Sequence, residues 1–401
     1  MQNKKSVLVI SVNARPLVAS IDQSRFDVYA VDYWGDIDLR DKVKDLFIIK
    51  DYEDYFQKLG MNDISFTDKV FYFTKEMVKK HPEISKIYIG SGLDDRPDLW
   101  EKISNIREII GNDFACIKKV RNRFKIYQIL ENCEIKAPRT AVITREKELK
   151  KFCEKVGFPV VIRSNISSGG GRGIFKINDG EEIKNIWRSL GYNKKINDII
   201  AQEFISGLDI SVTSLNYKNN VHIISVNEQL IGTKEVEAPY PFAYCGNIIP
   251  ANLSKNLIKK VKTFSKQLLK RLDLRGINGM DLKINENDLY FMEINPRFPG
   301  TIEIIEMLTG YNIMDLHNKA YNGKIIPITL PEGKVGIKLI PYSKKRMIMK
   351  KLARKPYYYD IPMERETIEK EDPILTIQII GTNRKNIIKK AFEIIENLYL
   401  F

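Results

Sequence analysis

Three oxygen-bearing side chains lie close together in the segment from Gly279 to Arg297. Asp281 stands in the sequence GMDLK, and Glu293 and Asn295 stand in FMEINPR. Because side chains alternate along a strand, Glu293 and Asn295 are expected to face the same way. Two carboxylates and an amide oxygen are ligands that Mg²⁺ accepts together with substrate phosphates and water. This spacing predicts a magnesium site.

The two acidic residues are predicted to face each other across a β-hairpin. A turn over residues 286–288 pairs 285 with 289, and stepping outward along both strands then pairs 281 with 293. Opposed carboxylates repel about as strongly as a favourable cross-strand pair attracts. A cation between them removes this repulsion, and residue 293 stands in an apolar run where an unpaired charge is costly. A surface hairpin with scattered acids is the alternative.

A glycine-rich segment, Ser167-Ser168-Gly169-Gly170-Gly171-Arg172-Gly173, follows a predicted strand that ends at Arg163. Its glycines let backbone N–H groups approach a polyanion closely. It is not a Walker loop, because no Gly-Lys-Ser/Thr follows and the next element is predicted to be a strand. The forked cation of Arg163 favours phosphate binding, whereas a flexible hairpin tip without a ligand is the alternative.

The elements before these motifs indicate a parallel α/β domain at the start of the chain. Apolar, β-branched runs at 6–12, 28–31 and 86–89 alternate with helical segments. The loop after the first run reads Asn13-Ala14-Arg15 and lacks the glycines of a dinucleotide fingerprint, so a nicotinamide or flavin site is not expected there. Further strands are predicted at 158–163 and 173–177, where they form a hairpin whose tip is the glycine-rich segment.

Composition narrows the class of protein. The chain has 401 residues, enough for roughly two to four domains. No apolar run approaches the ~20 residues of a membrane-spanning helix. The polar residues 1–6 lead directly into an apolar run, so no signal peptide and a cytoplasmic location are expected. The scattered cysteines predict reduced thiols rather than disulfides or a zinc site: Cys116, Cys133, Cys153 and Cys245.

The formal net charge of +14 admits three interpretations. A solvated, lysine-rich surface is one, and a polyanionic small substrate is the second. The third is a nucleic-acid partner, for which KKLARKPYYY at 350–359 is the only stretch that interleaves basic and aromatic residues. A protein of this third kind would lose affinity for nucleic acid steeply with added salt.

Taken together and in this order, these segments resemble the ATP-grasp superfamily over roughly residues 116–325. Biotin carboxylase and the biotin-independent carboxylase of purine synthesis are relatives, and the closer resemblance is to archaeal and methylotroph proteins described as predicted ATP-dependent carboligases. The segments VDYWGDID at 31–38 and GSGLDDRP at 90–97 are similar to the amino-terminal domain of that group. Residues 360–376 resemble the small closing domain of the carboxylases.

The resemblance implies an α/β (α+β) ATP-grasp fold in three parts. An N-terminal Rossmann-like domain is expected at 1–115 and an ATP-grasp domain at 116–328, with a flap or lid subdomain at about 136–203. A small β-rich C-terminal domain is expected at 329–401.

The resemblance also implies the ligands of ATP and of two Mg²⁺ ions, for which Mn²⁺ can substitute. The metal ligands are Asp281, Glu293 and Asn295. The phosphates are held by Arg123, Arg163, Ser167, Ser168, Gly169, Gly170 and Gly171. The adenine is held by Gln202, Glu203 and Ile205, and the ribose by Asp209. Arg297 and Arg163 are the implied catalytic residues. Both family lysines are arginines here, at 123 and 163, and a planar fork is not interchangeable with an ammonium group.

The implied reaction is a carboxylate–amine ligation. A substrate carboxylate attacks the γ-phosphate, and an amine then converts the acyl phosphate to an amide, with release of ADP and phosphate. A carboxylase that activates bicarbonate as carboxy phosphate is the alternative. The expected partners are thus a small carboxylate with an amine, or bicarbonate, and a homodimer is a family-level expectation. Substrate contacts are predicted at Arg15, Asp94, Asp95 and Arg96, with ordinary surface arginines as the alternative for the two arginines.

Overall fold

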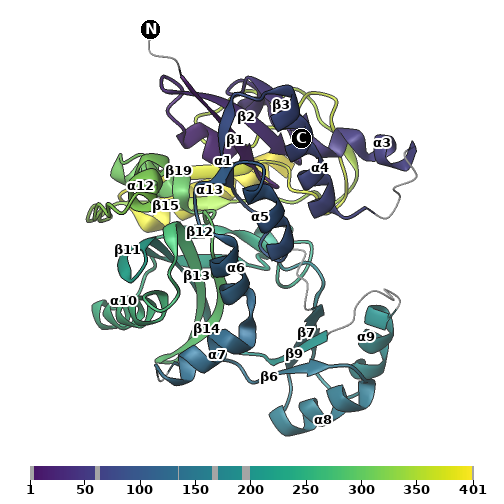
Figure 1. The fold of residues 1–401 in the computed structure, drawn as a ribbon. Helices are drawn as coiled ribbons and strands as arrows, with labels where there is room; N and C mark the ends of the chain where they lie inside the picture. Colours follow the sequence, from purple (N-terminus) through teal and green to yellow (C-terminus); the bar gives the residue numbers. More distant parts are fainter. Residues whose placement is uncertain (1–3, 59–63, 134, 165–169, 192–198, 400–401) are drawn as a thin grey trace.

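The computed structural model describes residues 4–58, 64–133, 135–164, 170–191 and 199–399 (Figure 1). At its N-terminal end a five-stranded parallel sheet runs in the order β3-β2-β1-β4-β5. Its strands are β1 Lys5–Ile10, β2 Phe26–Asp32, β3 Asp45–Ile48, β4 Ile84–Ile89 and β5 Glu108–Ile109. Its helices are α1 Arg15–Ser20, α2 Ile37–Arg40, α3 Glu53–Lys58, α4 Phe66–Lys80 and α5 Pro97–Ser104, with a 3₁₀ turn at Ile49–Tyr52. The predicted parallel α/β domain is confirmed, and apolar strands are what a sheet covered on both faces requires.

An eight-stranded antiparallel sheet forms the centre of the molecule, in the order β14-β13-β10-β11-β12-β15-β19-β17. Five of its strands come from the middle of the chain: β10 Leu208–Tyr217, β11 Asn220–Ile231, β12 Tyr244–Ile249, β13 Arg275–Asn285 and β14 Asp288–Asn295. One face packs on α6 Phe114–Arg121, α7 Arg123–Glu131 and α10 Lys255–Leu269. The other packs on α11 Ile302–Thr309 and α12 Ile313–Tyr321, and a 3₁₀ turn at Lys234–Val236 precedes β12.

The C-terminal segment extends this central sheet. Its strands β15 Val335–Leu339, β19 Thr376–Gly381 and β17 Tyr358–Tyr359 continue from β12. A two-stranded sheet, β16 Met347–Ile348 with β18 Thr367–Ile368, and the helix α13 Arg384–Tyr399 complete it. The middle and C-terminal segments therefore share one sheet, and their division at residue 328 stays a prediction. Over the part of the chain described, no helix combines the length and apolar character that crossing a membrane demands.

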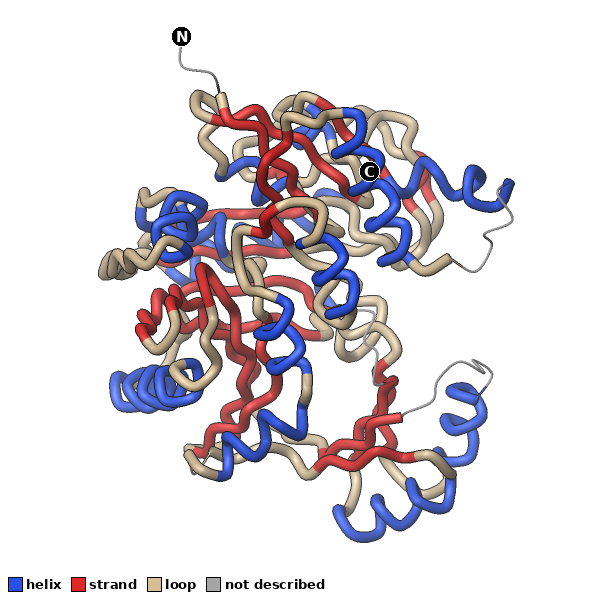
Figure 2. Tube along the Cα trace, in the orientation of Figure 1, coloured by secondary structure: helices blue, strands red, loops and turns tan. Residues whose placement is uncertain are grey.

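A four-stranded antiparallel sheet, ordered β6-β9-β7-β8, stands apart from the central sheet (Figures 1 and 2). It contains β6 Thr140–Ile143, β7 Val160–Ser164, β8 Ile174–Ile177 and β9 Ile199–Glu203, and it carries α8 Glu146–Val156 and α9 Glu182–Gly191. Its apolar side chains form a core of their own. The predicted hairpin is confirmed, because β7 pairs with β8. We call this unit the lid.

The hairpin of β13 and β14 has a shorter turn than predicted and contains a β-bulge. The predicted pairing of 285 with 289 is wrong: Asn285 pairs with Asp288 across a two-residue turn in which Glu286 has φ of 53°. A register shift of one residue then falls between the 282–291 and 281–293 pairs, so Met292 is the extra residue of a β-bulge. The bulge compensates for the shorter turn and places Asp281 opposite Glu293, as predicted.

A buried ion network joins the N-terminal, central and C-terminal segments. Arg15, at the start of α1, is 2% exposed. Its Nη2 lies 2.6 Å from Glu303 Oε2 on α11, its Nη1 contacts the other oxygen of Glu303, and its Nε donates to Asp360 Oδ1. These two carboxylates come from segments far apart in the sequence, so the guanidinium fixes how the three segments meet.

We predict that Arg15→Leu lowers the free energy of unfolding by about 3–5 kcal/mol, because it leaves two buried carboxylates without their cation. Urea denaturation followed by circular dichroism measures this loss. Arg354→Leu is the matched control: its pair with Asp41 is 65% and 50% exposed, so its loss should stay below about 1 kcal/mol. Losses of equal size in the two variants would contradict a structural role for the network.

Candidate active site

The three oxygen ligands predicted from the sequence come together on the β13–β14 hairpin. Asp281 pairs with Glu293, and Asn295 is two residues further along β14. Asn295 Nδ2 donates to Asp281 Oδ2 over 2.8 Å, and Gln229 Nε2 on β11 donates to Asp281 Oδ1 over 3.0 Å. Both oxygens of Asp281 are thus held in a fixed orientation, with Asn295 and Gln229 as supports. Gln229 was not foreseen, because nothing in the sequence pairs β11 with this hairpin.

The electrostatics of this hairpin favour a cation. Burial, followed by repulsion from Glu293, raises the pKa of Asp281 to about 7. A carboxyl group with such a pKa is easily deprotonated once a metal ion replaces the proton. Across the described ranges, no three His, Cys, Asp or Glu residues gather into a metal site. Two carboxylates and the Asn295 amide form a sparse, oxygen-only set, which fits Mg²⁺ that keeps water or phosphate as its other ligands.

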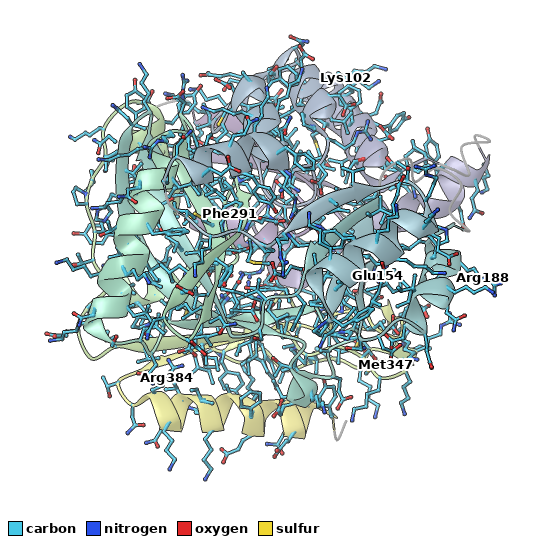
Figure 3. The ribbon with its side chains drawn as sticks, turned by 90° about the horizontal axis from the view of Figure 1, so that it is seen from below. Lys102, Glu154, Arg188, Phe291, Met347 and Arg384 are labelled. Carbon is cyan, nitrogen blue, oxygen red and sulfur yellow. The ribbon has the colours of Figure 1, made fainter. Side chains whose placement is uncertain are left out.

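A cavity beside the hairpin is lined by cationic side chains from the lid and from the helices. Arg163, on β7 of the lid, lies with its Nη1 3.8 Å from Glu293 Oε2. Arg123, the first residue of α7, lines the same cavity, together with Phe291 and Met292. In Figure 3, Phe291 lies inward of the lid helices that Glu154 and Arg188 mark. The structure therefore brings the two predicted phosphate ligands, Arg123 and Arg163, to a cavity that Glu293 also lines.

A third arginine, Arg121, completes this wall and was missed in the sequence. It lies at the end of α6, lines the cavity and contacts Asp95 Oδ1. Burial opposes its charge, but Glu293, Asp95 and Asp94 outweigh burial and raise its pKa above the ordinary value. The signal was the spacing Arg121-Asn122-Arg123, in which the first arginine comes two residues before the predicted ligand.

Arg297 connects the metal-ligand hairpin to the loop after β4. Its Nη2 lies 3.4 Å from Asn295 Oδ1, and its Nε donates to Asp94 Oδ2 over 2.5 Å. The next residue of the loop, Asp95, pairs with Arg121. Burial, only partly offset by Arg121, raises the pKa of Asp95. Of the predicted substrate contacts, Asp94 and Asp95 are therefore brought to the hairpin.

The two arginines predicted to contact substrate are engaged in other ion pairs. Arg15 is held in the buried network of Glu303 and Asp360. Arg96 lies 2.8 Å from Asp98 and 3.1 Å from Asp68, on the N-terminal segment itself. Neither arginine contacts the metal-ligand hairpin in the hydrogen bonds and ion pairs of the described residues.

The described end of the glycine-rich segment reaches from the lid to the central sheet. The backbone oxygen of Gly170 accepts a hydrogen bond from Tyr244 N over 3.3 Å. At Gly171, where φ is +85°, an added Cβ would lie 1.9 Å from the backbone oxygen of Phe242. Glycine is thus required at 171 both by conformation and by space. Three of the predicted phosphate ligands lie outside the described residues: Ser167, Ser168 and Gly169.

The strand predicted to hold adenine is β9 of the lid. Gln202 is 7% exposed, and its Nε2 donates to Tyr127 Oη over 3.0 Å. The carboxylate of Glu203 binds Arg139, with Nε 3.1 Å from Oε2, and Ile205 is buried. Gln202 thus bonds to α7 and Glu203 to Arg139, and contact of either side chain with adenine stays a prediction.

The predicted ribose ligand lies where the lid joins the central sheet. Asp209, on β10, pairs with Lys283 of β13 at 2.8 Å. Lys283 also lies over the Phe204 ring, 5.8 Å from its centroid, and Lys176 of the lid lies 4.3 Å from the same centroid. Two cations thus flank one aromatic ring between lid and sheet, next to Asp209.

Comparison with known proteins places this chain in a family. Residues 120–301 match the family model described as ATP-grasp domain. A protein of Methanocaldococcus jannaschii, itself uncharacterized, is 31% identical over 387 residues, covering 96% of this chain and 91% of that protein. The C-terminal section of the carbamoyl phosphate synthase large chain of Aquifex aeolicus is 24% identical over 226 residues, 56% of this chain and 41% of that protein.

Solved structures share the fold over nearly the whole chain. The biotin carboxylase domain of Hydrogenobacter thermophilus 2-oxoglutarate carboxylase, in complex with MgADP and bicarbonate, has a TM-score of 0.76 at 15% identity, over 97% of this chain and 89% of that one. N5-carboxyaminoimidazole synthetase of Staphylococcus aureus, complexed with ADP, has a TM-score of 0.71 at 13% identity, over 98% of this chain and 98% of that one. L-amino acid ligase of Bacillus licheniformis has a TM-score of 0.70 at 15% identity, over 99% of this chain and 98% of that one. The predicted ATP-grasp fold is confirmed.

The raised pKa of Asp281 predicts how Mg²⁺ stabilises the protein. Because the folded pKa of about 7 exceeds the unfolded value, the charge of Asp281 destabilises the metal-free protein progressively from about pH 4 to pH 7, and fully above that. Mg²⁺ should therefore raise the melting temperature by several degrees near pH 8 and by much less near pH 5.

Asp281→Asn should be more stable than the wild type near pH 8 without metal, and should show no Mg²⁺ effect. Asp288→Asn, at the exposed end of the same hairpin, is the control and should respond to Mg²⁺ as the wild type does. Differential scanning calorimetry of the three proteins measures this. An unchanged Mg²⁺ response in Asp281→Asn would exclude this hairpin as the metal site.

Proposed function

This chain belongs to the ATP-grasp family, and we propose that it is an ATP-dependent carboxylate–amine ligase that forms an amide through an acyl phosphate and releases ADP and phosphate. The observation that carries the proposal is the opposition of Asp281 and Glu293 on one hairpin, with Asn295 beside them. Arg163 and Arg297 approach this hairpin from two sides. A phosphoryl group bound there would be surrounded by groups that offset negative charge.

ATP is proposed to lie between the lid and the central sheet. Mg²⁺ held by Asp281, Glu293 and Asn295 would neutralise charge on the phosphates as they are transferred. Arg123 and Arg163 line the adjoining cavity and would bind phosphate oxygens. Each presents a planar fork, which holds two oxygens where a lysine holds one point contact. The glycine-rich segment would cover the phosphates, and its contact with Tyr244 and Phe242 supports a path across the site.

Three further ligands complete the proposed nucleotide site: Gln202 and Glu203 with Ile205 for adenine, and Asp209 for the ribose. Their place on and after β9, at the junction of lid and sheet, supports this assignment. The two lysines that flank Phe204 lie at the same junction.

Arg297 is the proposed catalytic residue at the acyl phosphate. Asp94 binds its Nε, so the guanidinium cannot turn away, and its Nη2 faces Asn295 of the metal-ligand set. A cation held in this way stabilises charge that develops on the transferred phosphoryl group without reorganising. Closure of the lid would exclude water and protect the acyl phosphate from hydrolysis.

A carboxylase is the second candidate. Its support is the likeness to the biotin carboxylase domain solved with MgADP and bicarbonate, which extends over 97% of this chain. The N5-carboxyaminoimidazole synthetase has a comparable likeness. In this case bicarbonate would take the place of the substrate carboxylate, and Arg163 and Arg297 would face carboxy phosphate.

ATP turnover decides between these functions. We expect ADP and phosphate release to be stimulated by a carboxylate with an amine, tested over a panel of both, and to fall by about 10²–10³-fold or more in Glu293→Gln. Glu286→Gln, in the exposed turn of the same hairpin, is the control and should keep full activity.

Stimulation by bicarbonate without any other carboxylate would establish the carboxylase instead. Turnover that is equal in Glu293→Gln and the wild type would contradict both candidates, because each depends on this hairpin.

A further inference from the structure

The loop after β4 occupies the place where open α/β sheets bind ligands. In the strand order β3-β2-β1-β4-β5, the chain proceeds outward in one direction from β1 and in the other from β4. The carboxyl ends of β1 and β4 therefore flank the point where the direction reverses, and ligands bind in the crevice outside such a point. The segment Gly90–Asp95 leaves β4 at this crevice and reaches the metal-ligand hairpin.

Contacts with the end of β1 fix this loop in place. Val12 N donates to Ser91 O over 2.9 Å, and Ser91 N donates to Ser11 Oγ over 3.0 Å. A Cβ at Gly90 would lie 2.4 Å from Ser11 Oγ, and one at Gly92 would lie 2.5 Å from Val12 Cγ2. The two glycines allow this close approach, so the acidic residues that follow are held by a rigid backbone.

The two acids of the loop each meet an arginine of the site. Asp94 Oδ2 binds Arg297 Nε at 2.5 Å, and Asp95 Oδ1 binds Arg121. Asp94 is 9% exposed, and its second oxygen, Oδ1, is enclosed and has no hydrogen-bond partner in the described residues. A buried acceptor without a donor costs about 1–3 kcal/mol. Asp94 thus has one carboxylate oxygen that can still accept a hydrogen bond.

The Arg121–Asp95 pair borders open space. Both residues line the cavity that Arg163 and Glu293 also line, so a ligand in this cavity can take the place of either partner. The loop supplies two carboxylates, and Arg121 and Arg297 supply two positive charges. Groups of both signs are therefore present for two reactants of opposite charge.

We propose that Asp94 and Asp95 bind the amine substrate as its ammonium ion, at the mouth of the crevice between β1 and β4. Asp95, which lines the cavity, then takes a proton from the nitrogen, whose lone pair attacks the acyl phosphate as phosphate leaves. This inference rests on the ligase function proposed above, and it names the amine as a cationic, primary one. An ammonium group has three donors, enough for Asp94 Oδ1, for Asp95 and for one further acceptor. Once it binds Asp95, Arg121 is free to face the anionic acyl phosphate across the cavity.

The test compares ammonium compounds with neutral counterparts. ADP release is measured with the carboxylate panel and with amino acids, putrescine and ethanolamine, each beside the analogue in which hydroxyl replaces the amino group. We expect at least one ammonium compound to stimulate release and its hydroxyl analogue not to do so. In Asp94→Asn and in Asp95→Asn, the KM for that amine should rise by about 10- to 100-fold, the loss expected for a charged hydrogen bond.

Two readouts separate binding of the amine from a merely structural role. In Asp95→Asn the KM for the carboxylate should change by less than about twofold, whereas an effect through Arg121 alone would lower kcat or raise that KM. Asp94→Asn also removes the partner of Arg297 Nε, so its kcat should fall in addition. Asp98→Asn is the matched control, because this acid lies close by in sequence and pairs with Arg96 instead; its kinetics should equal those of the wild type.

Several outcomes would overturn the inference. One is an unchanged amine KM in both Asn variants that still fold by their melting curves. Another is stimulation of equal size by a hydroxyl analogue. If no ammonium compound stimulates release, the ammonium site is also excluded. The ligase proposal fails separately, when turnover does not depend on Glu293.

Discussion

Two carboxylates held face to face are the constraint on which the rest of this structure depends. Asp281 and Glu293 are cross-strand partners on one hairpin, and no arrangement of backbone alone relieves their repulsion. The surrounding side chains respond to it: Asn295 and Gln229 donate to Asp281, and Arg163 approaches Glu293. These contacts offset the repulsion only in part: burial and the charge of Glu293 still raise the pKa of Asp281 to about 7. In the proposed function a divalent cation would supply the remaining charge, and phosphates would supply its other ligands.

The same charges organise the molecule at longer range. Arg297 and Arg121 extend the charged site to the loop after β4, so the parallel sheet contributes Asp94 and Asp95 to a site built on the antiparallel one. Behind this contact the Arg15 guanidinium ties α1 to α11 and to the C-terminal segment. The lid, by contrast, has its own apolar core and adds Arg163 from one side.

Sequence reasoning singled out residues of the candidate site because their signals are local. Strand alternation placed Glu293 and Asn295 on one face, and glycine content indicated the segment at 167–173 that reaches Phe242. The opposition of residues 281 and 293 was predicted from a turn one residue too long, and an unforeseen bulge at Met292 restored it. Local pattern does not reveal bulges, since the extra residue is specified by the neighbouring strands.

What the sequence could not show depends on contacts between distant segments. Arg15 was predicted to meet substrate, yet its partners are Glu303 and Asp360, 288 and 345 residues away. Arg121 was overlooked, because its importance follows from Asp95 on another segment. The C-terminal strands extend the central sheet through the pairing of β12 with β15, and no pattern within either segment reveals that pairing. In each case pairing across the fold decided the outcome.

The central claim is that the opposed carboxylates form the metal site. Its most direct test is electron paramagnetic resonance of Mn²⁺ with ADP, because the Mn²⁺ spectrum depends on the groups that coordinate the ion. We predict that the wild-type chain binds Mn²⁺ together with ADP, that a carboxylate of the protein enters its coordination shell, and that Glu293→Gln abolishes binding at the same concentrations. Mn²⁺–ADP bound equally by the wild type and by Glu293→Gln would contradict the account, because the opposed carboxylates would then not be the metal site.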